Sequence, residues 1–359
     1  MAKFVISTLK CTFVSLHQLL LFTNPYKYIM NSRRKFIADV SKGAILTSVA
    51  LSPSMGFASE LSPAKEFINK DKKLIRVGII GAENSHTANL GKLFNVEKAF
   101  PGVELQYVWG ETEELAKKAM EEGKIPNMVK KPEDMLGKID ALIVDHRHAK
   151  FHLEPAIPFI KAGIPTFIDK PFCYRVEEGK KFLKMAHDLG TPVTSFSTSA
   201  VNEQTYDIKK QVEEAGQINH MVCFGPVDID SQWGGVFFYG VHLVDTLTTI
   251  FGDNIEKVRV TKNGKNAVAD LAFKNGMIAT LIFLTQTYAF QYHAETKNGL
   301  IELKSRVQEA KPSIHYKEMV EMFRTGKEPR THESILYSIS VLEALERSVA
   351  NEKWEEIKV

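Results

Sequence analysis

The chain has 359 residues, of which 44% are hydrophobic and 25% charged. This composition is typical of globular proteins and excludes disordered, collagen-like and coiled-coil structures, and the length predicts two domains. Three cysteines are too few for a disulfide framework. Residues 59–359 contain 39 Lys and Arg and 42 Asp and Glu, so this part of the chain is slightly acidic. A slightly acidic protein is not expected to bind nucleic acid.

Residues 1–58 have the features of an export signal. The segment Asn31-Ser-Arg-Arg-Lys-Phe36 precedes an apolar run over 43–50, and small residues lead to Ala58. Paired arginines before such a run are typical of twin-arginine signals, so we predict an exported, periplasmic protein. Met30 is an alternative start of translation. The apolar run over 13–22 is shorter than the roughly 20 residues that a bilayer requires, so no stable membrane span is predicted for the mature form.

After a linker over 59–72, residues 73–197 alternate between β-branched runs and helical patterns. We predict strands at 74–80, 103–109, 140–144, 165–168 and 192–196, with helices at 88–94, 113–122 and 152–162. Strands separated by helices favour a parallel sheet with right-handed crossovers. The pattern predicts a doubly wound, Rossmann-type α/β domain.

Residues 198–359 have a different rhythm. A helix is predicted at 202–214, followed by strand-like runs at 220–224, 257–261, 267–273, 277–285, 291–295 and 299–303. Asn263-Gly and Asn275-Gly are hairpin turn signals, and helices at 316–325 and 332–350 close the chain. We predict an α+β domain with a large, open, mainly antiparallel sheet.

The first predicted strand leads into a loop that resembles a dinucleotide-binding turn, Gly81-Ala82-Glu83-Asn84-Ser85-His86. Gly81 matches the first glycine of the fingerprint, but Glu83 and His86 stand where the second and third belong. We predict that all six residues contact a cofactor. Asn84 and Ser85 are good N-caps that can donate hydrogen bonds to phosphate oxygens. The carboxylate of Glu83, in contrast, would repel a phosphate. Glu111, after the second strand, comes one position late for an acid that binds ribose.

Two further segments bear polar groups. Asp169-Lys170-Pro171 follows a strand, which directs Lys170 into the crevice where such sheets bind ligands. Gly234-Gly235 precedes a Gly-x-His-x-x-Asp stretch with His242 and Asp245, at the start of an apolar helix. Together, in order and spacing, these segments resemble the Gfo/Idh/MocA family (glucose–fructose oxidoreductase, inositol dehydrogenase and MocA) over residues 73 to about 350.

The resemblance implies NAD or NADP as cofactor, a sugar or polyol substrate and a homo-oligomer. We expect the cofactor to be tightly bound, because free NAD(P) is scarce outside the cytoplasm. It implies that Lys170 contacts substrate and cofactor and that His242 binds the substrate hydroxyl or exchanges its proton. A histidine pKa of about 6.5 would suit that role. The aspartate that the family has four residues before this histidine is replaced by Phe238, which cannot transfer a proton.

The segment Asp145-His146-Arg147-His148 with His152 allows two interpretations. If a helix begins early enough, His148 and His152 lie on one helix face, the spacing of a metal site. Alternatively, the loop skirts the cofactor. We predict cofactor contacts from His146 and Arg147, and no metal site.

Three functions follow as hypotheses. The first is an NAD(P)-dependent oxidoreductase with Lys170 and His242 as catalytic residues. The second is cofactor-assisted glycoside cleavage on the same fold. The third, favoured by Glu83, His86 and Phe238, is a non-catalytic ligand-binding or assembly protein. The sequence does not specify the substrate, and it does not distinguish NAD from NADP.

Overall fold

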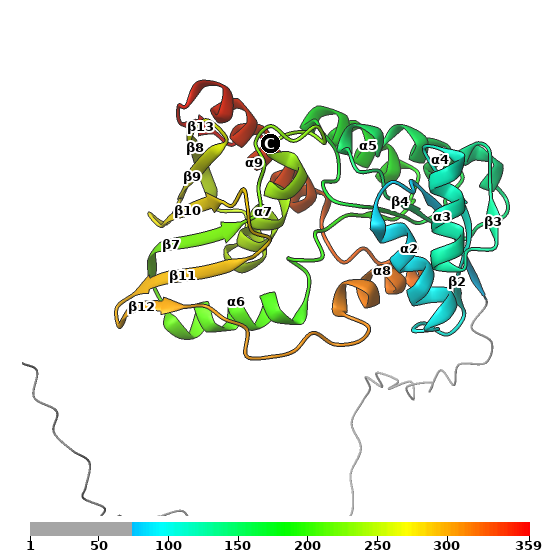
Figure 1. Ribbon diagram of the computed structural model, residues 1–359, viewed down its shortest axis with the longest axis horizontal. Coiled ribbons are helices and arrows are strands. Elements are labelled where there is room, and N and C mark those ends of the chain that lie inside the picture. Colours follow the sequence, from blue (N-terminus) through cyan, green and yellow to red (C-terminus); the bar gives the residue numbers. More distant parts are fainter. Residues whose placement is uncertain (1–73) are drawn as a thin grey trace, which may run out of the picture. The chain divides into compact units, whose positions relative to one another are not determined.

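The computed structural model describes residues 74–359 (Figure 1). The predicted signal over 1–58 and the linker over 59–72 lie outside the described residues. Within the part that is described, no helix combines the length and the apolar character that a membrane crossing requires.

The N-terminal sheet has six parallel strands in the order β3-β2-β1-β4-β5-β6. Their bounds are β1 Ile75–Ile80, β2 Val103–Trp109, β3 Asn127–Met128, β4 Ala141–Val144, β5 Thr166–Ile168 and β6 Val193–Thr194. The order reverses at β1, whose neighbours are β2 and β4. This topology confirms the doubly wound α/β prediction, and the switch point at β1 is where ligands bind in such folds.

Helices α2 Ser85–Gly91, α3 Glu113–Gly123, α4 Ile157–Lys161 and α5 Val176–Asp188 connect these strands. The backbones of α2 and α3 approach closely, because a Cβ on Gly91 would lie 2.6 Å from the Cα of Gly123. The helix predicted at 152–162 is wrong in its first half, where a short 3₁₀ turn, Glu154–Ala156, replaces it. Pro155 and Pro158 lack the N–H that a continuous α-helix needs.

The C-terminal sheet has seven strands in the order β12-β11-β7-β10-β9-β8-β13. Their bounds are β7 Ile218–Gly225, β8 Ile255–Asn263, β9 Asn266–Phe273, β10 Ile278–Phe283, β11 Gln291–Thr296, β12 Gly299–Glu302 and β13 Glu355–Glu356. Every pair is antiparallel except β7 with β10, so the prediction of a mainly antiparallel sheet is confirmed.

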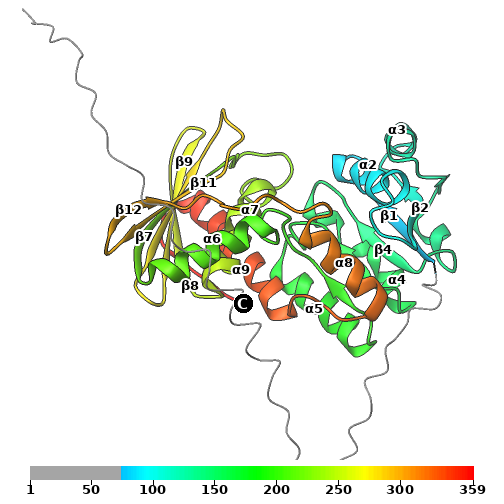
Figure 2. The same ribbon diagram turned by 90° about the horizontal axis from the view of Figure 1, so that it is seen from below.

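Helices α6 Glu203–Ala215, α7 Phe237–Phe251 and α9 His332–Asn351 lie on one face of this sheet (Figure 2). Residues of β9 and β10 alternate between buried and partly exposed, as expected for a sheet with a single covered face. Helix α8 Ile314–Thr325 follows the C-terminal sheet in the chain but packs Met319 and Phe323 into the core of the N-terminal sheet.

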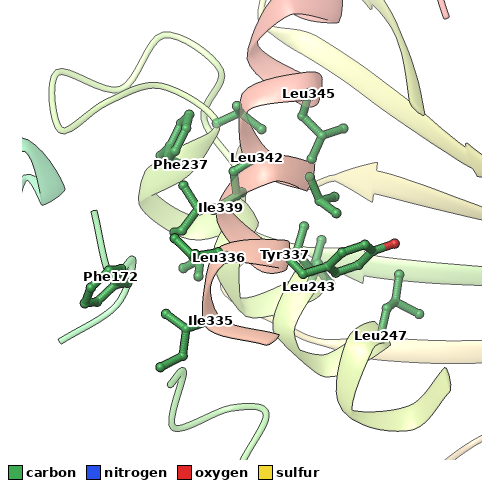
Figure 3. Packing of buried hydrophobic residues seen from close by; sticks show 14 of the residues in the cluster. Phe172, Phe237, Leu243, Leu247, Ile335, Leu336, Tyr337, Ile339, Leu342 and Leu345 are labelled. Atoms are coloured by element: carbon green, nitrogen blue, oxygen red, sulfur yellow. The ribbon is translucent and has the colours of Figure 1, made fainter. Parts of the chain in front are cut away.

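The core between α7 and α9 fixes the loop that carries Lys170. Figure 3 shows Phe237 and Leu243 of α7 close to Ile339 and Leu342 of α9. Phe172, two residues after Lys170, belongs to the same cluster and is 2% exposed. Burying such a ring stabilises a fold by about 1.5–3 kcal/mol, so the packing of Phe172 helps to hold the loop after β5.

Candidate functional site

The carboxyl ends of three neighbouring strands bring the predicted site residues together. The backbone N–H of Asp145 donates to Ile80 at 2.7 Å, and that of Asp169 donates to Val144 at 2.8 Å. The residues that follow β1, β4 and β5 therefore share one edge. The predicted cofactor-binding residues and Lys170 all lie on the connections that follow these three strands.

Gly81 is required by the backbone of the neighbouring strand. Its φ is +111°, a conformation that favours glycine, and a Cβ there would lie 2.7 Å from the carbonyl carbon of Asp145. The glycine thus allows the end of β1 to approach the end of β4, and its presence alone does not indicate a nucleotide.

The loop after Gly81 nevertheless binds an anion, the carboxylate of Glu111. The backbone N–H groups of Ala82 and Glu83 both donate to Glu111 Oε2 at 2.9 Å. Glu111 Oε1 lies 2.9 Å from His146 Nδ1. Burial favours the neutral acid, but the hydrogen bonds from His146 and from the Ala82 N–H lower the pKa of Glu111. Glu111 comes one position late for a ribose-binding acid by sequence, yet its carboxylate lies on the loop.

Glu83 lies beside this carboxylate. Burial, and then the charge of Glu111, raise the pKa of Glu83, while Arg147 and His146 oppose the rise. The repulsion expected between Glu83 and a diphosphate is therefore reduced by two basic neighbours.

His86 contacts carboxylates instead of the loop backbone. Its Nδ1 lies 3.2 Å from Asp169 Oδ2 and 3.5 Å from Asp145 Oδ1. Burial alone would lower its pKa, but the charge of Asp169 and hydrogen bonds to both carboxylates raise the pKa of His86 to about 10. Asn84 Nδ2 also donates to Asp145 Oδ1, at 3.0 Å. The third-glycine position thus connects the ends of β4 and β5.

Lys170 is buried next to Asp169, with Nζ 3.3 Å from Asp169 Oδ2. The same Nζ lies 6.0 Å from the centre of the Phe238 ring. Arg147 lies 5.6 Å from that ring and 5.2 Å from the ring of Trp233, within the range of cation–π contacts. Where the family has an acid, this chain has an aromatic ring facing two cations.

His242 is held on the buried helix α7. Its Nδ1 lies 2.7 Å from Ser197 Oγ, and the backbone N–H of Ser197 donates to Asp245 Oδ2 at 2.9 Å. Burial, followed by the charge of Lys170, lowers the pKa of His242 to about 3. The expectation of a pKa near 6.5 is therefore wrong: the imidazole is neutral at any pH above about 4.

The histidines of the loop after β4 do not share a helix face. Both ring nitrogens of His152 lie against backbone carbonyl oxygens, Nδ1 at 2.8 Å from Pro171 and Nε2 at 2.7 Å from His146. His148 caps a 3₁₀ turn by accepting from the Lys150 N–H. The alternative of a metal site on His148 and His152 is therefore contradicted.

Two cavities open beside these groups. One of about 510 Å³ is lined by His86, Asp145 and Asp169 together with polar side chains such as Ser199 and Asn202. A second, of about 680 Å³, is lined by polar side chains together with the aromatic rings of Trp233, Phe238, Tyr239 and Tyr288.

The fold and the crevice define a Rossmann-type domain joined to an open-sheet domain, with polar groups at the switch point. Residues 75–196 match the Gfo/Idh/MocA model, described as an oxidoreductase family with an NAD-binding Rossmann fold. The match covers the N-terminal domain, so the resemblance to this family expected from the sequence is confirmed for that domain. No curated protein matches the sequence.

Solved structures share the fold over most of the described chain. Myo-inositol 2-dehydrogenase of Lactobacillus plantarum is 19% identical with a TM-score of 0.68, over 80% of this chain and 100% of that one. Myo-inositol dehydrogenase of Lactobacillus casei, solved with NAD(H) and myo-inositol, is 14% identical with a TM-score of 0.67, over 80% and 97%. A probable dehydrogenase of Thermotoga maritima is 16% identical with a TM-score of 0.67, over 79% and 99%. At these identities the likeness concerns the fold.

Proposed function

We propose that the protein is an NAD-dependent oxidoreductase that acts on a hydroxyl or carbonyl carbon of a sugar or polyol. The observation that carries the proposal is that the anion-binding loop after β1, Lys170 and the helix bearing His242 meet at one edge of a parallel sheet. The family match and the inositol dehydrogenase fold support it.

The residues at this edge fit a dinucleotide. The N–H groups of Ala82 and Glu83 donate to the carboxylate of Glu111, which places that carboxylate where ribose recognition requires an acid. The loop over 81–86, Glu111, His146 and Lys170 would hold the cofactor. When bound, the nicotinamide would accept or supply the hydride.

The chain's own residues would orient the substrate and hold its proton. Lys170 presents an ammonium that can polarise a substrate oxygen, and Asp169 fixes its direction. His242 is neutral, so it can donate or accept a hydrogen bond without a titration step. Phe238 supplies no acid, and its ring instead packs beside the cations of Lys170 and Arg147.

Glu111 is expected to select NAD over NADP. A carboxylate within reach of the adenosine ribose accepts from its hydroxyls but repels a 2′-phosphate. Mass spectrometry of ligand released by denaturation should therefore find NAD(H). Glu111→Gln should weaken the affinity for NAD and reduce the difference between the affinities for NAD and NADP, as measured by calorimetry. Glu114→Gln, on the exposed side of α3, should change neither affinity.

Released NADP(H), or an unchanged NAD preference in Glu111→Gln, would contradict the role of Glu111. Absence of any nucleotide, with no binding on addition, would instead favour a non-catalytic sugar-binding protein, the alternative that Phe238 supports. Cofactor-assisted glycoside cleavage would be recognised by cleaved product with no net change in cofactor redox state.

We also propose that the protein is exported by the twin-arginine route to the periplasm. The support is the Arg33-Arg34 pair followed by an apolar run and small residues. Replacing both arginines with lysine in the full chain should leave the protein in the cytoplasmic fraction of a bacterial host. Periplasmic recovery of that variant would contradict the proposal.

A further inference from the structure

We propose that His86, Asp145 and Asp169 form a binding site for one divalent transition-metal ion. The three residues come from the first turn of α2 and from the ends of β4 and β5. One ligand atom from each lies within 4.8 Å of the others. The proposal does not depend on the oxidoreductase function.

The spacing of the donor atoms matches a coordination shell. His86 Nδ1 is 3.2 Å from Asp169 Oδ2 and 3.5 Å from Asp145 Oδ1. With metal–ligand bonds of about 2.0–2.2 Å, neighbouring ligands in a tetrahedral shell are about 3.3–3.6 Å apart. One ion can lie between the three atoms once His86 Nδ1 has lost its proton and the Asn84 amide, whose Nδ2 lies 3.0 Å from Asp145 Oδ1 and 3.3 Å from His86 Nδ1, has turned aside.

Partners outside the cluster orient one of the carboxylates. Thr87 Oγ1 lies 2.7 Å from Asp145 Oδ2, which leaves Asp145 Oδ1 directed at His86. The side chain of Asp145 is fully enclosed and that of Asp169 nearly so. Such supporting hydrogen bonds are typical of metal ligands. The hydrogen bond from Thr87 also helps to keep the carboxylates of Asp145 and Asp169 adjacent, and a bound cation would offset the repulsion between them.

The cavity of about 510 Å³ opens on all three residues. It leaves room for water or a ligand oxygen to complete the shell, as in metal sites that keep an open position. One imidazole and two carboxylates suit Zn²⁺, Mn²⁺ or Fe²⁺ better than Cu(I), which prefers sulfur. Lys170 Nζ lies 3.3 Å from Asp169 Oδ2, the same oxygen that faces His86. The ion would therefore bind on the side facing the cavity.

Zn²⁺ titration of the purified, chelator-treated chain by calorimetry tests the proposal, with Co²⁺ absorption as a spectroscopic probe. We expect one ion per chain. His86→Gln and Asp145→Asn should abolish binding, and Thr87→Val should weaken it about 10–100-fold. His220→Gln is the matched control, because His220 also contacts a carboxylate, Glu295, but on the exposed surface.

Thermal unfolding followed by circular dichroism identifies any variant that fails to fold. His86 is partly exposed, so we expect His86→Gln to fold. This variant therefore still tests Zn²⁺ binding if Asp145→Asn does not fold. Absence of Zn²⁺ binding by the parent chain, or binding that survives in a folded His86→Gln variant, would overturn the proposal. The cluster would then be an ion-pair network of His86 and Lys170 with the two aspartates.

Discussion

Replacing Lys170 with alanine is expected to lower turnover about 10²–10⁴-fold, the range for removal of a positioned proton-transfer or polarising group. Lys170 is buried at the crevice, and its ammonium is aligned by Asp169 at 3.3 Å. Phe238 supplies no acid that could replace it. Steady-state kinetics with NAD(H) and a panel of sugars and polyols measures the effect, with Lys161→Ala on the exposed face of α4 as control. Unchanged turnover in Lys170→Ala would contradict a catalytic role for Lys170.

The pH dependence of the same reaction follows from His242. Its pKa of about 3 keeps the imidazole neutral through the usual assay range, and it gains a proton only as the pH falls below about 4. The pH–rate profile should therefore show no inflection near 6.5 that is due to His242. An inflection there that disappears in His242→Gln would contradict the neutral state.

The sheets could be predicted from local pattern, because apolar periodicity and turn residues act within a few positions. The predicted strand at 103–109 coincides with β2, and the hairpin signal at Asn263-Gly264 joins β8 to β9. The prediction of a helix at 152–162 is wrong because it rested on the spacing of apolar residues. Pro155 and Pro158 lack the N–H donors that a continuous helix needs. The short strand β3 and helix α5 were missed.

The site could be predicted only in part, because its contacts cross long stretches of sequence. Glu111 accepts hydrogen bonds from the N–H groups of Ala82 and Glu83, nearly thirty positions earlier in the chain. The spacing of residues in the sequence does not predict such a contact. His86 marks a departure from the glycine pattern, but its partners Asp145 and Asp169 become visible only when β4 and β5 lie side by side. The low pKa of His242 depends on burial, which follows from tertiary packing.

Asp245→Ala is expected to lower the free energy of unfolding by about 1–3 kcal/mol, because the partly exposed guanidinium of Arg330 loses its charged partner and keeps only hydrogen bonds to groups such as Ser334 and Ser338. Asp245 Oδ1 lies 3.3 Å from Arg330 Nη2, and the two side chains are 4% and 16% exposed. Asp188→Ala is the matched control, because its ion pair with Lys184 is exposed and such pairs contribute about 0–1 kcal/mol. Urea denaturation measures both variants.

The same substitution should also disturb the catalytic crevice. Asp245 accepts from the backbone N–H of Ser197, whose Oγ lies 2.7 Å from His242 Nδ1, so it is a positioning residue for that imidazole. Asp245→Asn, which keeps the shape but removes the charge, should retain more stability than alanine and still lower kcat more than it changes KM. Loss of stability in Asp245→Ala no greater than in Asp188→Ala would show that the Arg330 pair is not a principal link between α7 and the start of α9.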